Sequence, residues 1–194
     1  MKKTILVIFT TLMAVTALTG CNMFAKANGV ILYGEEEEIL NAVEKEKDKL
    51  VEEELHKIKI LTNDDQKIMI LTVETAQSLV EKKLISEITN QEKAKTKAIS
   101  SLSKVAKGEA LLFTKEKSHE LEIEDVNINI KYEGNLVIGE GRVYADLFLI
   151  VNDDDWDSLK GTEKTLAILE YDKDPSAKGL SYDVEKAQLV RIQD

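Results

Sequence analysis

The amino-acid sequence predicts an α+β fold in which N-terminal amphipathic helices pack on a C-terminal antiparallel sheet, a meander. Apolar residues recur at spacings of three, four and seven between residues 35 and 107, as in helices, whereas short apolar runs separated by turn residues fill 109–194. Helices followed by a run of strands are typical of the α+β class. The length favours a single domain, which we expect over residues 35–194.

The helix-rich part, 35–107, opens with four glutamates. Glu35–Glu38 complement the positive end of a helix dipole, and Gly34 is an acceptable N-cap. Four consecutive carboxylates point in different directions on a helix, so they do not converge on one cation. The apolar face of this predicted helix is Ile39, Leu40, Val43, Leu50, Val51, Leu55 and Ile58.

A turn signal, Asn63-Asp64-Asp65, separates this helix from the next elements. Its flanks, Lys57–Leu61 and Gln66–Val73, could pair as a hairpin, or the second flank could begin another helix. Thr89 and Glu92 match a capping box. The sequence therefore predicts either two helices, over 76–88 and 94–105, or one long helix with a joint near Thr89.

The strand-rich part, 109–194, contains five strand-like stretches. Glu133-Gly134-Asn135 reads as a hairpin loop, and Gly139 with Gly141 indicates a bulge or sharp bend. Both faces of the segment from Gly141 to Val151 are partly apolar, which predicts a central strand covered on both sides. The expected strands are 110–114, 121–132, 136–151, 164–171 and 181–192.

The first twenty residues differ in kind from the rest. Lys2 and Lys3 form a basic start, and Ile5–Leu18 is uncharged and mostly apolar. This stretch is shorter than the roughly 20 residues that a transmembrane helix needs, so it is typical of a secretory signal peptide. The sequence Leu18-Thr19-Gly20-Cys21 follows, in which small residues precede the single cysteine.

These residues resemble the lipobox of bacterial lipoproteins. The resemblance implies cleavage between Gly20 and Cys21, removal of 1–20, and a diacylglyceryl group on the Cys21 sulfur, with Leu18, Thr19 and Gly20 read by the signal peptidase. Membrane lipid would then be one partner of the chain, through the acylated cysteine. Residues 21–34 would form a lipidated N-terminus and short linker, in which Val30–Tyr33 could be a brief strand.

Charge and composition exclude several classes of function. The net charge of -10, with 36 acidic against 26 basic residues, argues against binding of nucleic acid through a basic face. One cysteine excludes intramolecular disulfides and Cys-rich metal sites. Since removal of 1–20 takes away two lysines, the mature chain is still more acidic, and we expect an anionic bilayer to repel its surface.

The acidic stretch 152–157 is the most suggestive metal-binding pattern. Asp153, Asp155 and Asp157 have the one-three-five spacing of an EF-hand loop, but Ser158 stands where that loop needs glycine, and Lys164 replaces its final glutamate. We therefore interpret the stretch as an acidic turn, with Trp156 packed on the core. These three aspartates remain weak candidates for a cation site.

No catalytic motif accompanies the two histidines, His56 and His119. We therefore expect a non-enzymatic module without a cofactor, anchored on the extracytoplasmic face of the cell membrane and binding an envelope or surface protein. The Lys-, Ile- and Glu-rich composition favours a bacterium with one membrane. Two alternatives stay open: a small-ligand or cation carrier that uses the sheet face and the acidic loop 152–157, and an envelope hydrolase.

Overall fold

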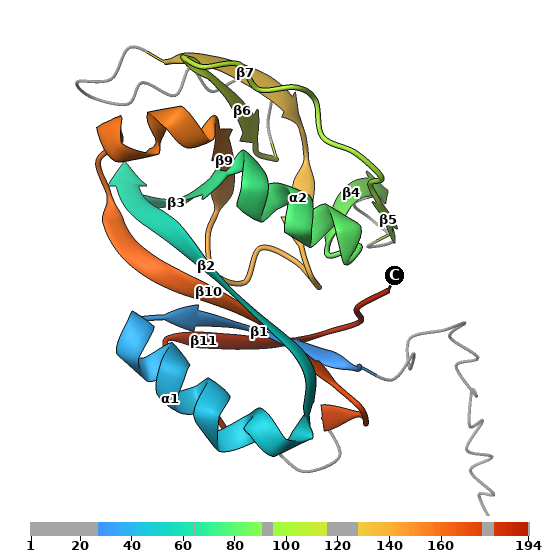
Figure 1. Ribbon diagram of the computed structural model, residues 1–194. Coiled ribbons are helices and arrows are strands. Elements are labelled where there is room, and N and C mark those ends of the chain that lie inside the picture. The colour runs from blue at the N-terminus through green and yellow to red at the C-terminus, as the bar shows by residue number, and fades with distance from the viewer. Residues whose placement is uncertain (1–26, 64, 91–94, 116–127, 176–180, 194) are drawn as a thin grey trace, which may run out of the picture.

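The computed structural model describes residues 27–63, 65–90, 95–115, 128–175 and 181–193. Within them the chain forms one large and one small β-sheet with short helices on their faces (Figure 1). The large sheet has the strand order β11 (Lys186–Val190), β1 (Gly29–Gly34), β10 (Thr162–Tyr171), β2 (Leu50–Asn63), β3 (Gln66–Thr72), β9 (Leu147–Val151), β6 (Glu109–Phe113), β7 (Asn129–Gly134). The small sheet has the order β5 (Lys95–Ala98), β4 (Ile85–Asn90), β8 (Leu136–Ile138).

The predicted fold class is wrong. The structure is mostly β, and its strands come from both halves of the chain instead of following a helical half. The large sheet is mixed and not a meander, because β3 pairs with β9 in parallel and β6 pairs with β7 in parallel. The short α-helices α1 (Glu36–Glu46) and α2 (Val73–Glu81) cover parts of this sheet.

The first predicted helix ends a dozen residues early. Helix α1 and the short 3-10 helix η1 (Lys47–Lys49) are followed by β2, which pairs with β10 from Leu50 to Ile60. The same sequence fits a strand, since Glu52, Glu54 and His56 alternate with residues of the other face. Pairing with β10 is a long-range interaction that overrides a local helical spacing.

The predicted second pair of helices is confirmed only in part: α2 overlaps the helix expected over 76–88, whereas the rest of the pair forms strands. The hairpin across residues 63–65 is confirmed by the antiparallel pairing of β2 with β3. Helix α2 begins at once after β3, where the side chain of Thr72 accepts a hydrogen bond of 3.1 Å from the backbone N–H of Thr75. Thr89 is no cap, because it lies inside β4, and Lys95–Ala98 forms β5.

The central part of the large sheet is covered on both faces. On one face, α2, β4 and β8 enclose the main apolar core, which includes Ile58, Leu79, Phe148 and Ile168. On the other face, α1 covers β1 and β10, and the 3-10 helix η2 (Asp153–Ser158) adjoins β3 and β9. The strand predicted over 136–151 is confirmed only in its last part, because Leu136–Ile138 belongs to the small sheet and Leu147–Val151 forms β9. Strand β9 lies between β3 and β6 and is buried along its whole length, as expected for a central strand.

The predicted bend after β8 is present. Gly139 has a φ of +60°, and a Cβ at this position would lie 2.7 Å from Oε1 of Gln188, so glycine is needed for both reasons. The bend separates β8 in the small sheet from β9 in the large one. The loop predicted at 133–135 connects β7 to β8, which belong to different sheets, so it is no hairpin.

Strand β1 lies within the segment expected to be a linker, 21–34. Its residues are all buried between β10 and β11, so the folded part of the chain begins by Gly29. The signal peptide and Cys21 lie outside the described residues. None of the helices within the described ranges is both long and apolar enough to cross a bilayer.

Candidate functional site

The point where the N-terminal segment joins the domain is fixed by Asn28. Its side chain donates to the carbonyl of Ile192 at 3.2 Å and accepts from the N–H of the same residue at 2.8 Å. Leu18, Thr19, Gly20 and Cys21 precede this point and lie outside the described residues. The domain therefore starts seven residues after the predicted lipidation site.

The aspartates of the acidic stretch do not converge. Asp155 is buried and accepts a 2.6 Å hydrogen bond from the N–H of Gly108, whereas Asp153 accepts a long one of 3.4 Å from the N–H of Glu74. Within the described part of the chain, no three acidic, His or Cys side chains are grouped so that they could hold a metal ion. Trp156 packs on the core, as predicted.

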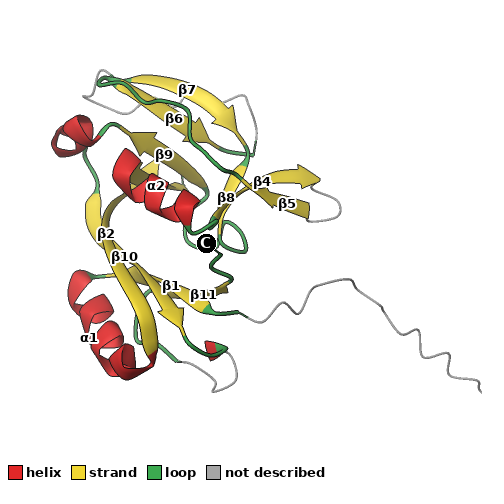
Figure 2. Cartoon of the chain, turned by 45° about the vertical axis from the view of Figure 1, so that its right-hand side comes forward, coloured by secondary structure: helices red, strands yellow, loops and turns green. Residues whose placement is uncertain are grey.

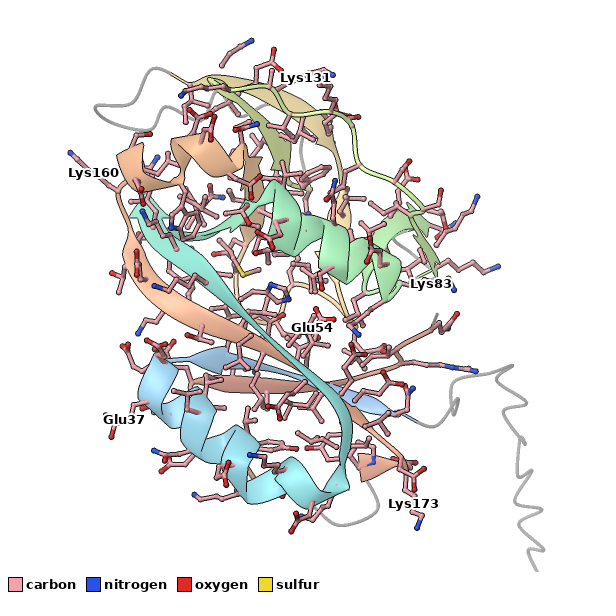
Figure 3. All side chains as sticks on the ribbon, viewed as in Figure 1. Glu37, Glu54, Lys83, Lys131, Lys160 and Lys173 are labelled. Carbon is pink, nitrogen blue, oxygen red and sulfur yellow. The ribbon has the colours of Figure 1, made fainter. Side chains whose placement is uncertain are left out.

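His56 belongs to a polar cluster between β2 and α2, which we call the Glu54 cluster (Glu52, Glu54, His56, Ser78, Lys82). Figure 3 shows Glu54 in the space between strand and helix. Its Oε2 accepts a hydrogen bond from Ser78 and lies 3.0 Å from Nε2 of His56. The Lys82 ammonium lies 3.0 Å from Oε1 of Glu54 and 2.7 Å from Oε2 of Glu52.

This arrangement is not that of a nucleophile activated by a base. A catalytic serine needs its hydroxyl hydrogen-bonded to the base, but Ser78 and His56 both meet the same oxygen of Glu54. Burial lowers the pKa of Lys82, but hydrogen bonds to Glu52 and Glu54 outweigh it and leave this pKa raised, so the ammonium stays charged. The charged side chains of the cluster therefore link α2 to β2 electrostatically. His119 lies outside the described residues.

Acid is expected to weaken this junction. Burial raises the pKa of Glu54, but hydrogen bonds from Ser78, Lys82 and His56 bring it below its ordinary value of 4.5. Its contribution to stability is therefore present above pH 4.5 and is lost as the pH falls through the lowered pKa, with about 1.4 kcal/mol for each unit of lowering. Urea unfolding between pH 7 and pH 3 should show this loss.

The variant Glu54→Gln should make the free energy of unfolding depend less on pH in the acid part of this range. Glu163→Gln is a matched control, because Glu163 is exposed and its ion pair with Lys57 spans 3.8 Å. An acid dependence in Glu54→Gln equal to that of the wild type would refute the assignment.

The aromatic residues of the predicted strands serve packing. Tyr144 stacks on Tyr33 with ring centroids 4.5 Å apart, and its hydroxyl donates to Glu185 at 2.7 Å. Phe148 and Tyr171 are buried in separate cores. Tyr171 also borders a small hollow next to Glu46, whose lining includes Leu50 and Pro175.

A hollow with a volume of about 540 Å³ lies on the outer face of the small sheet. Strands β4, β5 and β8 each contribute one side chain, and the bend after β8 closes one side. Two smaller hollows, of about 290 and 270 Å³, adjoin Glu46. We call the large hollow the Arg142 groove; its lining is Ile88, Thr96, Lys115, Val137, Glu140, Gly141 and Arg142.

Arg142 is the most constrained charge of this groove. Its guanidinium donates to the carbonyls of Asp146 at 2.8 Å and Phe113 at 3.3 Å, and lies 5.0 Å from the centroid of the Phe148 ring. Burial lowers the pKa of Arg142 to about 10, so the group remains a cation at neutral pH. With Lys115, Glu140 and the apolar side chains of Ile88 and Val137 it lines a concave surface in which a few charged groups lie beside apolar ones, as in many binding sites.

Sequence reasoning missed both the groove and the Glu54 cluster. The groove depends on β4 and β5, which the helical spacing concealed. A weak signal for the groove existed in Gly139 and Gly141, because glycine inside a strand pattern often marks a bend or a place where a ligand or another backbone approaches closely.

Comparison with known proteins extends these findings. The model of a family described as an uncharacterised lipoprotein family matches residues 27–193. Among solved structures, the chain resembles one described as "Putative Lipoprotein from Bacillus anthracis", with a TM-score of 0.78 and 24% identity over 86% of this chain and 100% of that one. This likeness concerns the fold. The comparison with curated proteins found no match.

Proposed function

Since the chain belongs to this uncharacterised lipoprotein family, which confirms the lipoprotein resemblance, we propose that it is a non-enzymatic binding module held on the extracytoplasmic face of the cell membrane. The anchor is acylated Cys21, with the lipobox Leu18-Thr19-Gly20 directing its processing. The matched domain begins six residues after that cysteine, which is the order expected for a module on a short lipid tether.

The observation that carries the binding role is the Arg142 groove. It is concave, opens on the small sheet, and places the cations Arg142 and Lys115 beside the apolar side chains of Ile88 and Val137. A segment of an envelope protein with acidic and apolar side chains matches this lining. The non-enzymatic assignment is supported by the Glu54 cluster, in which the carboxylate of Glu54 stands between Ser78 and His56.

Crosslinking of the lipidated protein in its own membrane tests the role of the groove. We expect one defined envelope protein to be captured by the wild type. Thr96→Trp, which fills the groove, and Lys115→Glu, which reverses one of its charges, should each lower this capture about tenfold, equivalent to about 1.4 kcal/mol. Both residues are exposed, so neither change should unfold the domain.

Lys131→Glu is the matched control. Lys131 is an exposed lysine of β7 outside the groove lining, and the same reversal of charge there should leave capture unchanged. Capture that is insensitive to both groove variants, or that falls equally in the control, would refute the proposal.

A further inference from the structure

The acidic chain has its charges segregated along the sequence. Residues 35–54 contain ten acidic residues and three lysines, whereas 82–107 contain seven lysines and two acidic residues. The first range forms α1 and the start of β2; the second forms the turn after α2, the hairpin β4–β5 and the segment that follows it. The net charge of the whole chain therefore does not describe the local charge of either region.

The lipid tether enters the fold between these two regions. Asn28 is bound to Ile192, and the N–H of Gln193 donates to the carbonyl of Lys82 at 3.3 Å. The exposed residues Arg191 and Lys83 therefore lie next to the entry point. Figures 1 and 2 both show the hairpin β4–β5, the C-terminal end and the start of β1 on one side of the molecule.

The hairpin adds two further cations to this side. Lys95 and Lys97 are exposed and alternate with Thr96, whose side chain lines the Arg142 groove, so the two lysines lie on the opposite face of β5. Glu87 pairs across the strands with Lys97. We call Lys83, Lys95, Lys97 and Arg191 the basic face.

The other side of the entry point carries mixed charges, and the acidic excess lies farther out, on α1. The N–H of Tyr171 donates to the carbonyl of Asn28 at 2.8 Å, and Asp172, Lys173 and Asp174 follow at this end of β10. Leu50, which pairs with Tyr171, follows Asp48 and the end of α1. Moving outward from the tether, the surface is basic toward β4–β5 and acidic toward α1.

We propose that the basic face rests on the anionic headgroups of the membrane to which Cys21 is attached, and that the α1 end is tilted away from them. This rests on the anchoring through Cys21 proposed above. The seven residues from Cys21 to Asn28 span at most about 25 Å when extended, so the domain is held close to the surface. Attraction and repulsion act within a Debye length of about 8 Å at physiological salt.

Lysine footprinting on vesicles tests this orientation. The lipidated protein is inserted into phosphatidylcholine vesicles with or without about 30% phosphatidylglycerol, enough to give an anionic surface potential, and is treated with a membrane-impermeant lysine acylating reagent. On the anionic vesicles we expect Lys83, Lys95 and Lys97 to react at least about threefold more slowly, and high salt should restore the rates. Lys131 and Lys45 should react equally on both.

A charge-reversal pair separates contact with lipid from structural effects. Lys95→Glu with Lys97→Glu should abolish the protection of Lys83, whereas Lys45→Glu on α1 with Lys47→Glu on η1, which changes the net charge equally, should leave it intact. Circular dichroism verifies the fold of both variants. Equal labelling of the wild type on neutral and anionic vesicles would overturn the proposal.

Two further readouts identify the source of any failure. Absence of flotation with neutral vesicles would refute the anchoring itself, whereas flotation without protection would refute only the orientation. Protection by soluble polyphosphate but not by anionic vesicles would show that the basic face binds an anionic polymer, which would also overturn the membrane proposal.

Discussion

Changing Cys21 to alanine is expected to move almost all of the protein out of the membrane fraction and to abolish its labelling with palmitate. The sulfur of Cys21 is the proposed attachment point of the lipid, and the chain contains no second cysteine. Each buried CH₂ of an acyl chain contributes about 0.8 kcal/mol, so two chains give a stable anchor and none leaves only weak surface contacts.

Fractionation and metabolic labelling measure this effect together. Asn22→Ala is the matched control, because it changes the neighbouring residue but leaves Leu18-Thr19-Gly20-Cys21 intact. Undiminished labelling and retention of Cys21→Ala would contradict the lipoprotein assignment of this residue.

Phe148→Ala is expected to cause the largest loss of stability, about 3–5 kcal/mol. Phe148 is 3% exposed in the central strand β9, opposite Met69 on β3 and Phe113 on β6. Its removal opens a cavity in the main core and takes away the ring against which the Arg142 guanidinium lies at 5.0 Å. Such a loss is a large part of the stability of an ordinary domain.

Urea or thermal unfolding of the purified domain measures the change. Val143→Ala is the control, since Val143 is 38% exposed and its truncation should cost about 0.5 kcal/mol or less. A cost below about 1 kcal/mol for Phe148→Ala would mean that β9 is not the centre of the core.

Predictions from the sequence succeeded where the signal lies in neighbouring residues. The turn at 63–65, the bend at Gly139 and the two-sided apolar pattern of β9 all depend on neighbouring residues, and the structure confirms them. The lipoprotein resemblance had the same character, because the lipobox is a short contiguous motif.

Prediction failed where long-range pairing decides the structure. Residues 50–58 place apolar side chains at a helical spacing, yet their partners Thr162–Tyr171 lie more than a hundred residues away. The apparent capping box at Thr89 failed for the same reason, since the segment pairs with Leu136–Ile138 and with Lys95–Ala98. No window of sequence contains both members of these pairs, so the local preference could not be outweighed.

The Glu54 cluster could not be predicted for the same reason. His56 can be read from the sequence, but its neighbours Glu54 and Ser78 come from a strand and a helix that only the fold brings together. The expected repulsion from an anionic bilayer was based on the net charge of the whole chain. The basic face proposed above would instead be attracted to such a bilayer.

Strand β1 also has a consequence for how the chain acquires its structure during export. The first folded segment lies between β10 and β11, so Gly29–Gly34 has no strand partner until residues 162–190 have been delivered. Sheets dominated by such distant pairings form slowly, because a long loop must close before the contacts are gained. On the export route proposed above, Cys21 would reach the membrane before the last strand closes the sheet.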